Sequence, residues 1–249
     1  MKSRYGLIGY PLSHSFSKNY FSQKFRDNSI DATYDLFPLE EIRSLLDILK
    51  TEQGLLGLNV TIPYKQQVIS MLDQISDDAA AMNSVNVIKI KKGDNHFILE
   101  GYNTDAPAFE SEIIDFAGNQ PGNALILGTG GASASVAYVL RKLGWEILFI
   151  SRFPNSHSNA LNYHEINESV MLQTRLIVNT TPLGMYPEVD NFPAIPYHFI
   201  TSKHYLFDLV YNPEITSFLL KGSKKGAHIK NGLGMLYKQA ELAWEIWQK

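Results

Sequence analysis

Two short segments of the sequence place polar side chains where separate chain elements end. Asn59-Val60-Thr61-Ile62-Pro63-Tyr64-Lys65 follows an apolar run, and Asn103-Thr104-Asp105 occurs later in the chain. These amides, hydroxyls and charged groups can converge on a small polyol-like substrate, because α/β proteins place their sites at strand ends. We expect Lys65 to donate a proton and Asp105 to orient it. Each also has a simpler interpretation, a solvated helix residue for Lys65 and a helix cap for Asp105.

A serine cluster near the N-terminus is a candidate anion site. Ser13-His14-Ser15-Phe16-Ser17 follows Gly9-Tyr10-Pro11 and leads into a helical pattern. Hydroxyl groups beside a helix N-terminus suit a carboxylate. A simple N-cap cluster is the alternative, and we assign no chemistry to His14.

A glycine-rich turn suggests a dinucleotide that moves a hydride. Gly128-Thr129-Gly130-Gly131-Ala132-Ser133 lies between a short apolar strand and a helical pattern, where the Rossmann fingerprint belongs. Gly128 allows the tight turn, Gly130 leaves room for a pyrophosphate, and N–H groups after Gly131 can bind phosphates. Ser133 stands where a third glycine is usual, so an ordinary βα turn is the alternative interpretation.

The end of the following strand indicates which dinucleotide binds. Ile150-Ser151-Arg152-Phe153 contains no acidic residue that could bond the ribose 2′-hydroxyl of NAD. Arg152 can instead pair with a 2′-phosphate, although most arginines are simply solvated. We therefore expect NADP as the cofactor.

Composition limits the class of protein. The chain has 249 residues, 45% of them hydrophobic and 19% charged, and a formal net charge of -3. This balance does not favour nucleic-acid binding, which needs a basic face. The absence of cysteine excludes disulfides and thiolate metal sites, and no metal site is predicted. Without a signal-peptide core or an apolar run of about 18 residues, we expect a cytoplasmic protein that does not enter a membrane.

Apolar runs and helical patterns alternate along the chain, which indicates an α/β fold with two domains. Strands are expected at 5–8, 32–37, 56–60, 85–90, 97–100, 124–127, 146–150, 176–178 and 206–210. Helices are expected at 17–28, 39–49, 63–72, 106–116, from the glycine turn to about 143, and at 233–247. A hairpin around Lys92-Gly93-Asp94-Asn95 makes the first sheet mixed. Continuous apolar strands predict a parallel second sheet covered on both faces.

Several segments together resemble shikimate dehydrogenase, of the shikimate/quinate dehydrogenase family. They follow the family's order along nearly the whole chain, and their combination is highly specific. The segments are 9–17, 59–65, Val85-Asn86, 103–105, 128–133, Asn179-Thr180-Thr181-Pro182-Leu183-Gly184-Met185 and Asn231-Gly232-Leu233-Gly234-Met235-Leu236.

The resemblance implies a substrate-binding domain, residues 1–104 and 233–249, with a mixed sheet and a C-terminal helix that returns to it. It implies an NADP-binding Rossmann domain at 105–232. The implied reaction is the reversible NADPH-dependent reduction of 3-dehydroshikimate to shikimate, a step of aromatic amino-acid biosynthesis.

The resemblance also implies roles for individual residues. Lys65 and Asp105 form the catalytic pair. The implied substrate-binding residues are Ser15, Ser17 and Tyr211 for the carboxylate, and Asn59, Thr61, Lys65, Asn86, Asp105 and Gln239 for the ring hydroxyls. The implied cofactor-binding residues are Gly128, Thr129, Gly130, Gly131, Ala132, Ser151, Arg152, Asn179, Thr180, Thr181, Leu209, Gly232 and Met235.

Four positions depart from the family pattern. Lys18 replaces a common proline and Ala106 a common glycine, while Ser151 and Phe153 replace the usual asparagine and the usual threonine or serine beside Arg152. A dehydrogenase that also uses quinate and a non-catalytic NADP-binding sensor are the alternative functions. The sequence leaves open a monomer or a homodimer.

Overall fold

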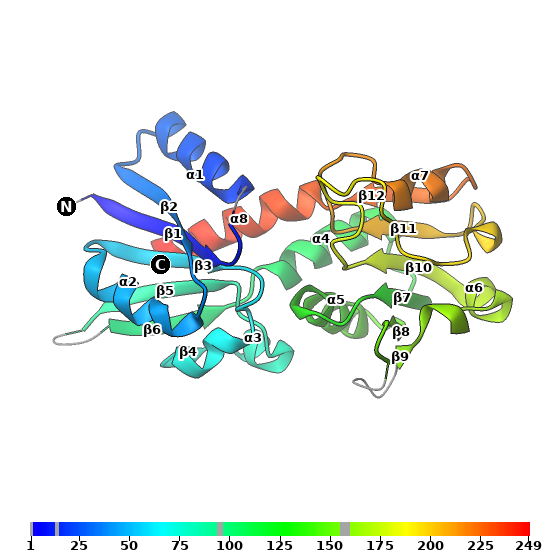
Figure 1. Ribbon diagram of the computed structural model, residues 1–249, viewed down its shortest axis with the longest axis horizontal. Coiled ribbons are helices and arrows are strands. Elements are labelled where there is room, and N and C mark those ends of the chain that lie inside the picture. The colour runs from blue at the N-terminus through cyan, green and yellow to red at the C-terminus, as the bar shows by residue number, and fades with distance from the viewer. Residues whose placement is uncertain (1, 13–14, 94–96, 155–159) are drawn as a thin grey trace. The chain divides into compact units, whose positions relative to one another are not determined.

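The computed structural model describes residues 2–12, 15–93, 97–154 and 160–249 (Figure 1). Ser13, His14 and the predicted hairpin turn at Asp94 and Asn95 lie outside these residues. The chain divides into two compact units, Met1–Thr104 with Ala240–Lys249, and Asp105–Gln239. The second division therefore falls inside the last helix, α8 (Leu233–Gln248), rather than at its start.

The first unit contains a mixed sheet, as predicted. Its described strands have the order β2-β1-β3-β5-β6-β4. The strands are β1 (Ser3–Gly9), β2 (Ala32–Pro38), β3 (Leu55–Val60), β4 (Gln74–Ile75), β5 (Val87–Lys92) and β6 (Phe97–Tyr102). β1 pairs in parallel with β2 and β3, whereas β5 is antiparallel to both β3 and β6.

Helices cover both faces of this sheet. Successive side chains of a strand point to opposite faces, so one strand contributes to two separate cores. On one face Ile8 packs in a core with α2 (Leu45–Thr51). On the other face Tyr5 and Leu7 pack with α1 (Phe16–Asp27) and the C-terminal part of α8. The last helix thus returns to the first unit, as predicted.

Trp247 of α8 attaches that helix to the sheet. Its indole nitrogen donates to the Ile88 carbonyl at 3.0 Å. A Cβ at Gly57 of β3 would lie 2.2 Å from the same nitrogen. Only glycine at this position therefore leaves room for the Trp247 ring.

Two predicted helices of the first unit are wrong in part. The helix expected at 39–49 is a 3-10 turn, η1 (Ile42–Ser44), followed by α2. The helix expected from Pro63 is a turn followed by another 3-10 segment, η2 (Gln67–Met71). The backbone explains the second case, because the Lys65 carbonyl accepts from the Val85 N–H at 2.8 Å instead of joining a helical ladder. The short helix α3 (Asp77–Met82) and β4 were not predicted.

The second unit contains a parallel sheet with described strand order β12-β11-β10-β7-β8-β9, confirming the predicted Rossmann topology. Its strands are β7 (Asn123–Leu127), β8 (Glu146–Ile150), β9 (Ala160–Leu161), β10 (Thr174–Asn179), β11 (Tyr205–Asp208) and β12 (His228–Asn231). The strand order reverses between β7 and β10. Ligands of such sheets bind in the crevice at this reversal, beside the carboxyl ends of the strands.

Helices lie on both faces of the parallel sheet (Figure 1). α4 (Asp105–Ala117) and α5 (Gly131–Lys142) cover one face, where Phe109 of α4 meets Phe207 of β11 edge to face. α6 (Glu168–Gln173) and α7 (Ser217–Ser223) pack with Leu125 and Leu206 on the other. Several elements of this unit were not predicted, because they are too short to show a clear period. They are α6, α7, β9, β12 and the 3-10 segments η4 (Tyr163–Glu165) and η5 (Tyr197–Phe199). Among the described helices, none has the length and apolar character that crossing a bilayer requires.

A buried hydroxyl in the first unit provides a test of the packing. Ser84 is fully buried, and its Oγ has no hydrogen-bond partner among the described residues. Ser84→Ala should raise the free energy of unfolding by about 1 kcal/mol in urea titrations, because it removes an unpaired polar group.

Thr104→Val is the matched control. The Thr104 hydroxyl is also buried, but it accepts from the Asn86 amide at 3.0 Å. Its loss should destabilise the protein by about 1–3 kcal/mol. Equal effects of the two substitutions would contradict the assignment of Ser84 as unpaired.

Candidate active site

Asn59 and Asn86 form the centre of the predicted substrate site in the first unit. Asn59 lies near the end of β3 and Asn86 directly precedes β5, and both are buried. The Val60 N–H donates to the Asn86 carbonyl at 2.8 Å, so the two residues are neighbours. The Asn59 amide nitrogen lies 3.4 Å from the same carbonyl.

Asn86 also holds the segment that leads into Asp105. Its Oδ1 accepts from the Thr104 N–H at 2.8 Å, and its Nδ2 donates to the Thr104 hydroxyl at 3.0 Å. Thr104 immediately precedes Asp105, the buried first residue of α4. Through Thr104, the amide of Asn86 thus anchors the chain where the predicted catalytic carboxylate begins.

The loop after β3 places Thr61 and Lys65 beside the same strands. The Thr61 N–H donates to the Ile8 carbonyl at 2.9 Å, and the Lys65 carbonyl is tied to Val85. A Cβ at Gly9 would lie 2.4 Å from the Thr61 Cγ2, so glycine is required at the end of β1. The backbone of Lys65 therefore lies close to that of Asn86, the residue after Val85.

The two predicted serines both lie at the start of α1. Ser15 is its N-cap, and its Oγ accepts from the Lys18 N–H at 3.4 Å. The N-cap interpretation of Ser15 is therefore correct, and it does not prevent a second role. Ser17 interacts with the side chain of Tyr34, a residue of β2 that was not predicted to belong to the site. Burial raises the pKa of Tyr34 above its ordinary value.

The glycine-rich turn of the second unit has the backbone that the Rossmann interpretation requires. Gly128 has φ +109, which favours glycine, and a Cβ there would lie 2.8 Å from the Thr180 hydroxyl. Gly130 is the N-cap of α5, and no described atom lies within 4 Å of where its Cβ would be. Ser133 replaces the third glycine without strain, since its hydroxyl donates to the Gly130 carbonyl at 2.5 Å. The α5 N-terminus, with Thr129, Gly131 and Ala132, therefore has the backbone geometry that suits a phosphate.

The end of β8 holds the residues predicted to select NADP. The Ser151 hydroxyl accepts from the Phe153 N–H at 3.1 Å, which closes a tight turn around Arg152. The Arg152 guanidinium lies 6.0 Å from the centre of the exposed Phe153 ring. An exposed cation at a strand end suits an anion, and Phe153 limits the directions in which it can extend.

A buried carboxylate organises the loop after β10. Asp208 of β11 accepts from the Asn179 amide at 2.9 Å, the Thr216 hydroxyl at 2.6 Å and the Val210 N–H at 3.0 Å. The Asn179 Oδ1 in turn accepts from the Thr181 N–H and hydroxyl. Asp208 was not predicted, because its partners lie far away in the sequence. Its only sequence signal is an acidic residue in an apolar strand.

The remaining predicted residues of the second unit lie around the start of α8. A Cβ at Gly232 would lie 2.2 Å from the Leu209 carbonyl oxygen, so these two backbones touch. The Leu209 N–H donates to the Asn179 carbonyl at 3.0 Å, which adds Thr180 and its loop to the group. Met235 is buried in the first turn of α8, Tyr211 is partly buried, and Gln239 donates to the Leu236 carbonyl. Tyr211, Gln239 and Asp105 belong to the second unit, whereas the other predicted substrate residues belong to the first.

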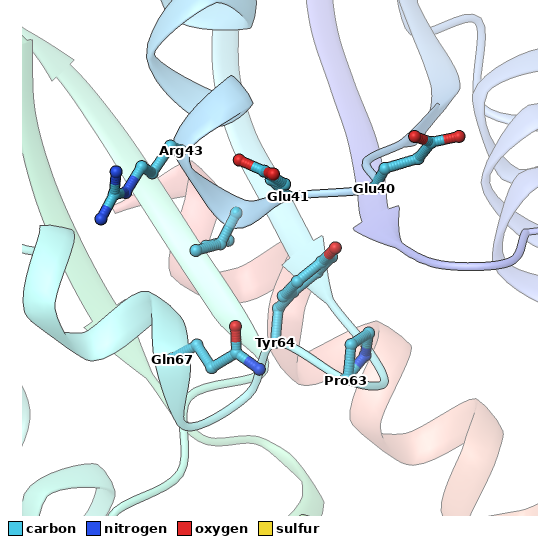
Figure 2. Close-up of a pocket in the computed structure, with 7 residues that line it drawn as sticks. Glu40, Glu41, Arg43, Pro63, Tyr64 and Gln67 are labelled. Carbon is cyan, nitrogen blue, oxygen red and sulfur yellow. The ribbon is translucent and has the colours of Figure 1, made fainter.

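An open hollow of about 490 Å³ lies beside the Lys65 loop (Figure 2). Its lining residues are Glu40, Glu41, Ile42, Arg43, Pro63, Tyr64 and Gln67. None of the predicted site residues is among them. The Tyr64 hydroxyl is occupied by the Leu39 carbonyl at 2.5 Å, so this tyrosine supports the loop.

Asp208 should make stability depend on pH. Burial raises its pKa from 3.8 to about 6, although its three hydrogen bonds act in the opposite direction. Because the folded pKa is the higher one, the stabilisation is complete below the unfolded value and is lost as pH rises through about 6. Relative to Asp208→Asn, the wild type should lose roughly 2–4 kcal/mol of unfolding free energy between about pH 4 and pH 7.

Urea titrations of both proteins across this range measure the difference. In the asparagine variant an amide oxygen still accepts from Asn179 and Val210, and its nitrogen can donate to Thr216. Thr216→Val, which removes one bond without removing the acid, is the control. If the difference in unfolding free energy between the wild type and D208N does not change with pH, the pKa of Asp208 is not raised.

Comparisons with known proteins match both units. The family model described as the shikimate dehydrogenase substrate binding domain matches residues 7–88. Enzymes named shikimate dehydrogenase (NADP(+)) from Methanococcus aeolicus and Clostridium beijerinckii are 35% and 38% identical, over 97% and 98% of this chain and 90% and 92% of their own lengths.

Solved structures agree with this match. A chorismate mutase/shikimate 5-dehydrogenase fusion protein from Clostridium acetobutylicum has a TM-score of 0.87 at 32% identity, covering 99% of this chain and 91% of its own. Shikimate 5-dehydrogenase from Thermus thermophilus, solved with NADP(H) and shikimate, has a TM-score of 0.83 at 29% identity, with coverage of 98% and 93%. Similarity at this level over almost the entire length shows that the chain belongs to the shikimate dehydrogenase family.

Proposed function

We propose that this protein is an NADP-dependent shikimate dehydrogenase, which reversibly reduces 3-dehydroshikimate to shikimate. The observation that supports it best is the near-complete match to relatives named shikimate dehydrogenase (NADP(+)), at 33–38% identity. The hydrogen-bonded arrangement of Asn59, Asn86 and Thr104 beside the Lys65 loop agrees with this function.

The chemistry divides between two groups of residues. When bound, NADPH supplies a hydride to the carbonyl carbon of the substrate. Lys65 donates a proton to the oxygen as it becomes an alkoxide, so that one C–H and one O–H bond form as the C=O double bond becomes single. Asp105 orients the ammonium group of Lys65 for this transfer. Proton transfer by a positioned group typically contributes about 10²–10⁴ to the rate.

The proposed substrate contacts follow from residue chemistry. Ser15, Ser17 and Tyr211 bind the carboxylate through hydroxyl groups at a helix N-terminus and a strand end. Ring hydroxyls bind to the remaining polar side chains. These are Asn59, Thr61, Asn86, Asp105 and Gln239.

The residues of the second unit fit a dinucleotide phosphate. The open space at Gly130 and the α5 N-terminus suit the pyrophosphate, and Arg152 suits a 2′-phosphate because β8 ends without an acidic residue. The loop after β10, with Leu209, Gly232 and Met235, forms the nicotinamide side. In this proposal residues 105–232 are the NADP-binding domain, and the rest is the substrate domain.

Initial rates of shikimate and quinate oxidation, each with NADP⁺ and NAD⁺, test the function. We expect shikimate with NADP⁺ to give the highest kcat/KM. Comparable rates with quinate would indicate dual specificity. NADPH binding without turnover of either acid would favour the sensor and overturn the enzyme.

Lys65→Ala tests the catalytic role within the same assay. It should lower kcat by about 10²–10⁴ with a modest change in KM, since the proton transfer occurs in the transition state. Lys50→Ala is the control, because Lys50 is an exposed lysine of the same unit that pairs with exposed Asp47 at 3.8 Å.

Arg152→Ala tests the cofactor preference. The KM for NADP⁺ should rise about ten- to a hundredfold, because a charge-assisted bond contributes roughly 1.5–3 kcal/mol, while the KM for NAD⁺ should change little. Arg141→Ala in the same unit is the control, as its guanidinium lies over the Phe149 ring. Equal increases for both cofactors would show that Arg152 does not contact the 2′-phosphate.

A further inference from the structure

We propose that Tyr34 is a positioning residue that determines which atom of the Asn59 amide turns toward the substrate. The inference rests on the proposed function, since it concerns how the substrate-binding side chains are oriented. Tyr34 lies on β2 and is buried, so it acts through its neighbours.

The orientation of the Asn59 amide follows from a backbone group. The Asn59 side chain has one end 3.4 Å from the Asn86 carbonyl oxygen, which can only accept. The amide nitrogen must therefore be at that end, and Oδ1 must face Tyr34. An amide oxygen can only accept, so the Tyr34 hydroxyl donates its single hydrogen to Asn59, over 2.8 Å.

The orientation of the Asn86 amide is determined in the same way, by a backbone group. The Thr104 N–H can only donate, and it meets Asn86 Oδ1 at 2.8 Å. The Asn86 nitrogen must then donate to the Thr104 hydroxyl. Two backbone groups thus settle the orientation of both asparagines without any choice of amide flip.

The position of the Tyr34 ring is fixed by its aromatic neighbours. The ring cannot turn away, since it stacks on Phe21 with 4.7 Å between ring centres and packs near Trp247. Tyr34 therefore keeps its hydroxyl directed at the amide near the end of β3.

A preference for one ligand chemistry follows. The Asn59 nitrogen has two hydrogens, and only one points at the Asn86 carbonyl. A ligand at this position is met by an N–H donor and must supply an accepting oxygen, such as that of a ring hydroxyl. A ligand ammonium or amide N–H at the same position would be rejected.

Tyr34→Phe tests the inference, with Tyr5→Phe as the matched control. Both tyrosines are 2% exposed and belong to the same aromatic core, but the Tyr5 hydroxyl accepts from the Gln248 amide, which is not a predicted site residue. Tyr34→Phe should raise the KM for shikimate about tenfold or more, because it leaves the buried Asn59 oxygen unpaired. The KM for NADP⁺ should stay within about twofold of the wild type, and Tyr5→Phe should leave both KM values near it.

Each outcome decides a different question. Equal shikimate KM values for the two variants, or a parallel rise in the KM for NADP⁺, would overturn the inference. A wild-type protein that does not oxidise shikimate would overturn the proposed function instead. If Tyr34→Phe does not fold, Asn59→Asp replaces it, since a carboxylate oxygen facing the Asn86 carbonyl should weaken shikimate binding at least tenfold with the NADP⁺ KM unchanged. If the KM of Asn59→Asp for shikimate equals that of the wild type, the assigned orientation of the Asn59 amide is wrong.

Discussion

The hydrogen bonds of Asn86 are the interaction on which the rest of the first unit's site depends. Its backbone bonds to Tyr102 of β6 and Val60 of β3, and its side chain bonds twice to Thr104. Buried polar groups need such partners, because leaving one unpaired costs more than a hydrogen bond contributes. One residue thereby links the end of β3 to Thr104 within the first unit.

The second unit has a similar set of hydrogen bonds at the carboxyl ends of strands β10 and β11. Asp208 holds Asn179, and Asn179 holds Thr181, so the loop after β10 has a defined shape. That loop contacts the place where a Cβ of Gly128 would be. The tight glycine turn and the buried acid are therefore parts of one hydrogen-bonded and closely packed arrangement.

Local patterns predicted most long elements and failed where distant backbone groups intervene. The strands of both sheets other than β4, β9 and β12, and helices α1, α4, α5 and α8, follow from periodicity, since each buries an apolar face. The helix expected at Pro63 does not form, because Lys65 bonds to Val85 across the sheet. No pattern within a few residues of Pro63 contains that bond.

The sequence by itself determined the residue types, the glycine turn, the basic end of β8 and the family. These are local properties, because chemistry and short-range backbone preferences depend on neighbouring residues. Only the tertiary structure decided that Tyr34 faces Asn59 and that Asp208 faces Asn179 and Thr216. Residues far apart in sequence become partners when parallel strands are aligned, and the donor and acceptor directions of buried groups follow from those partners.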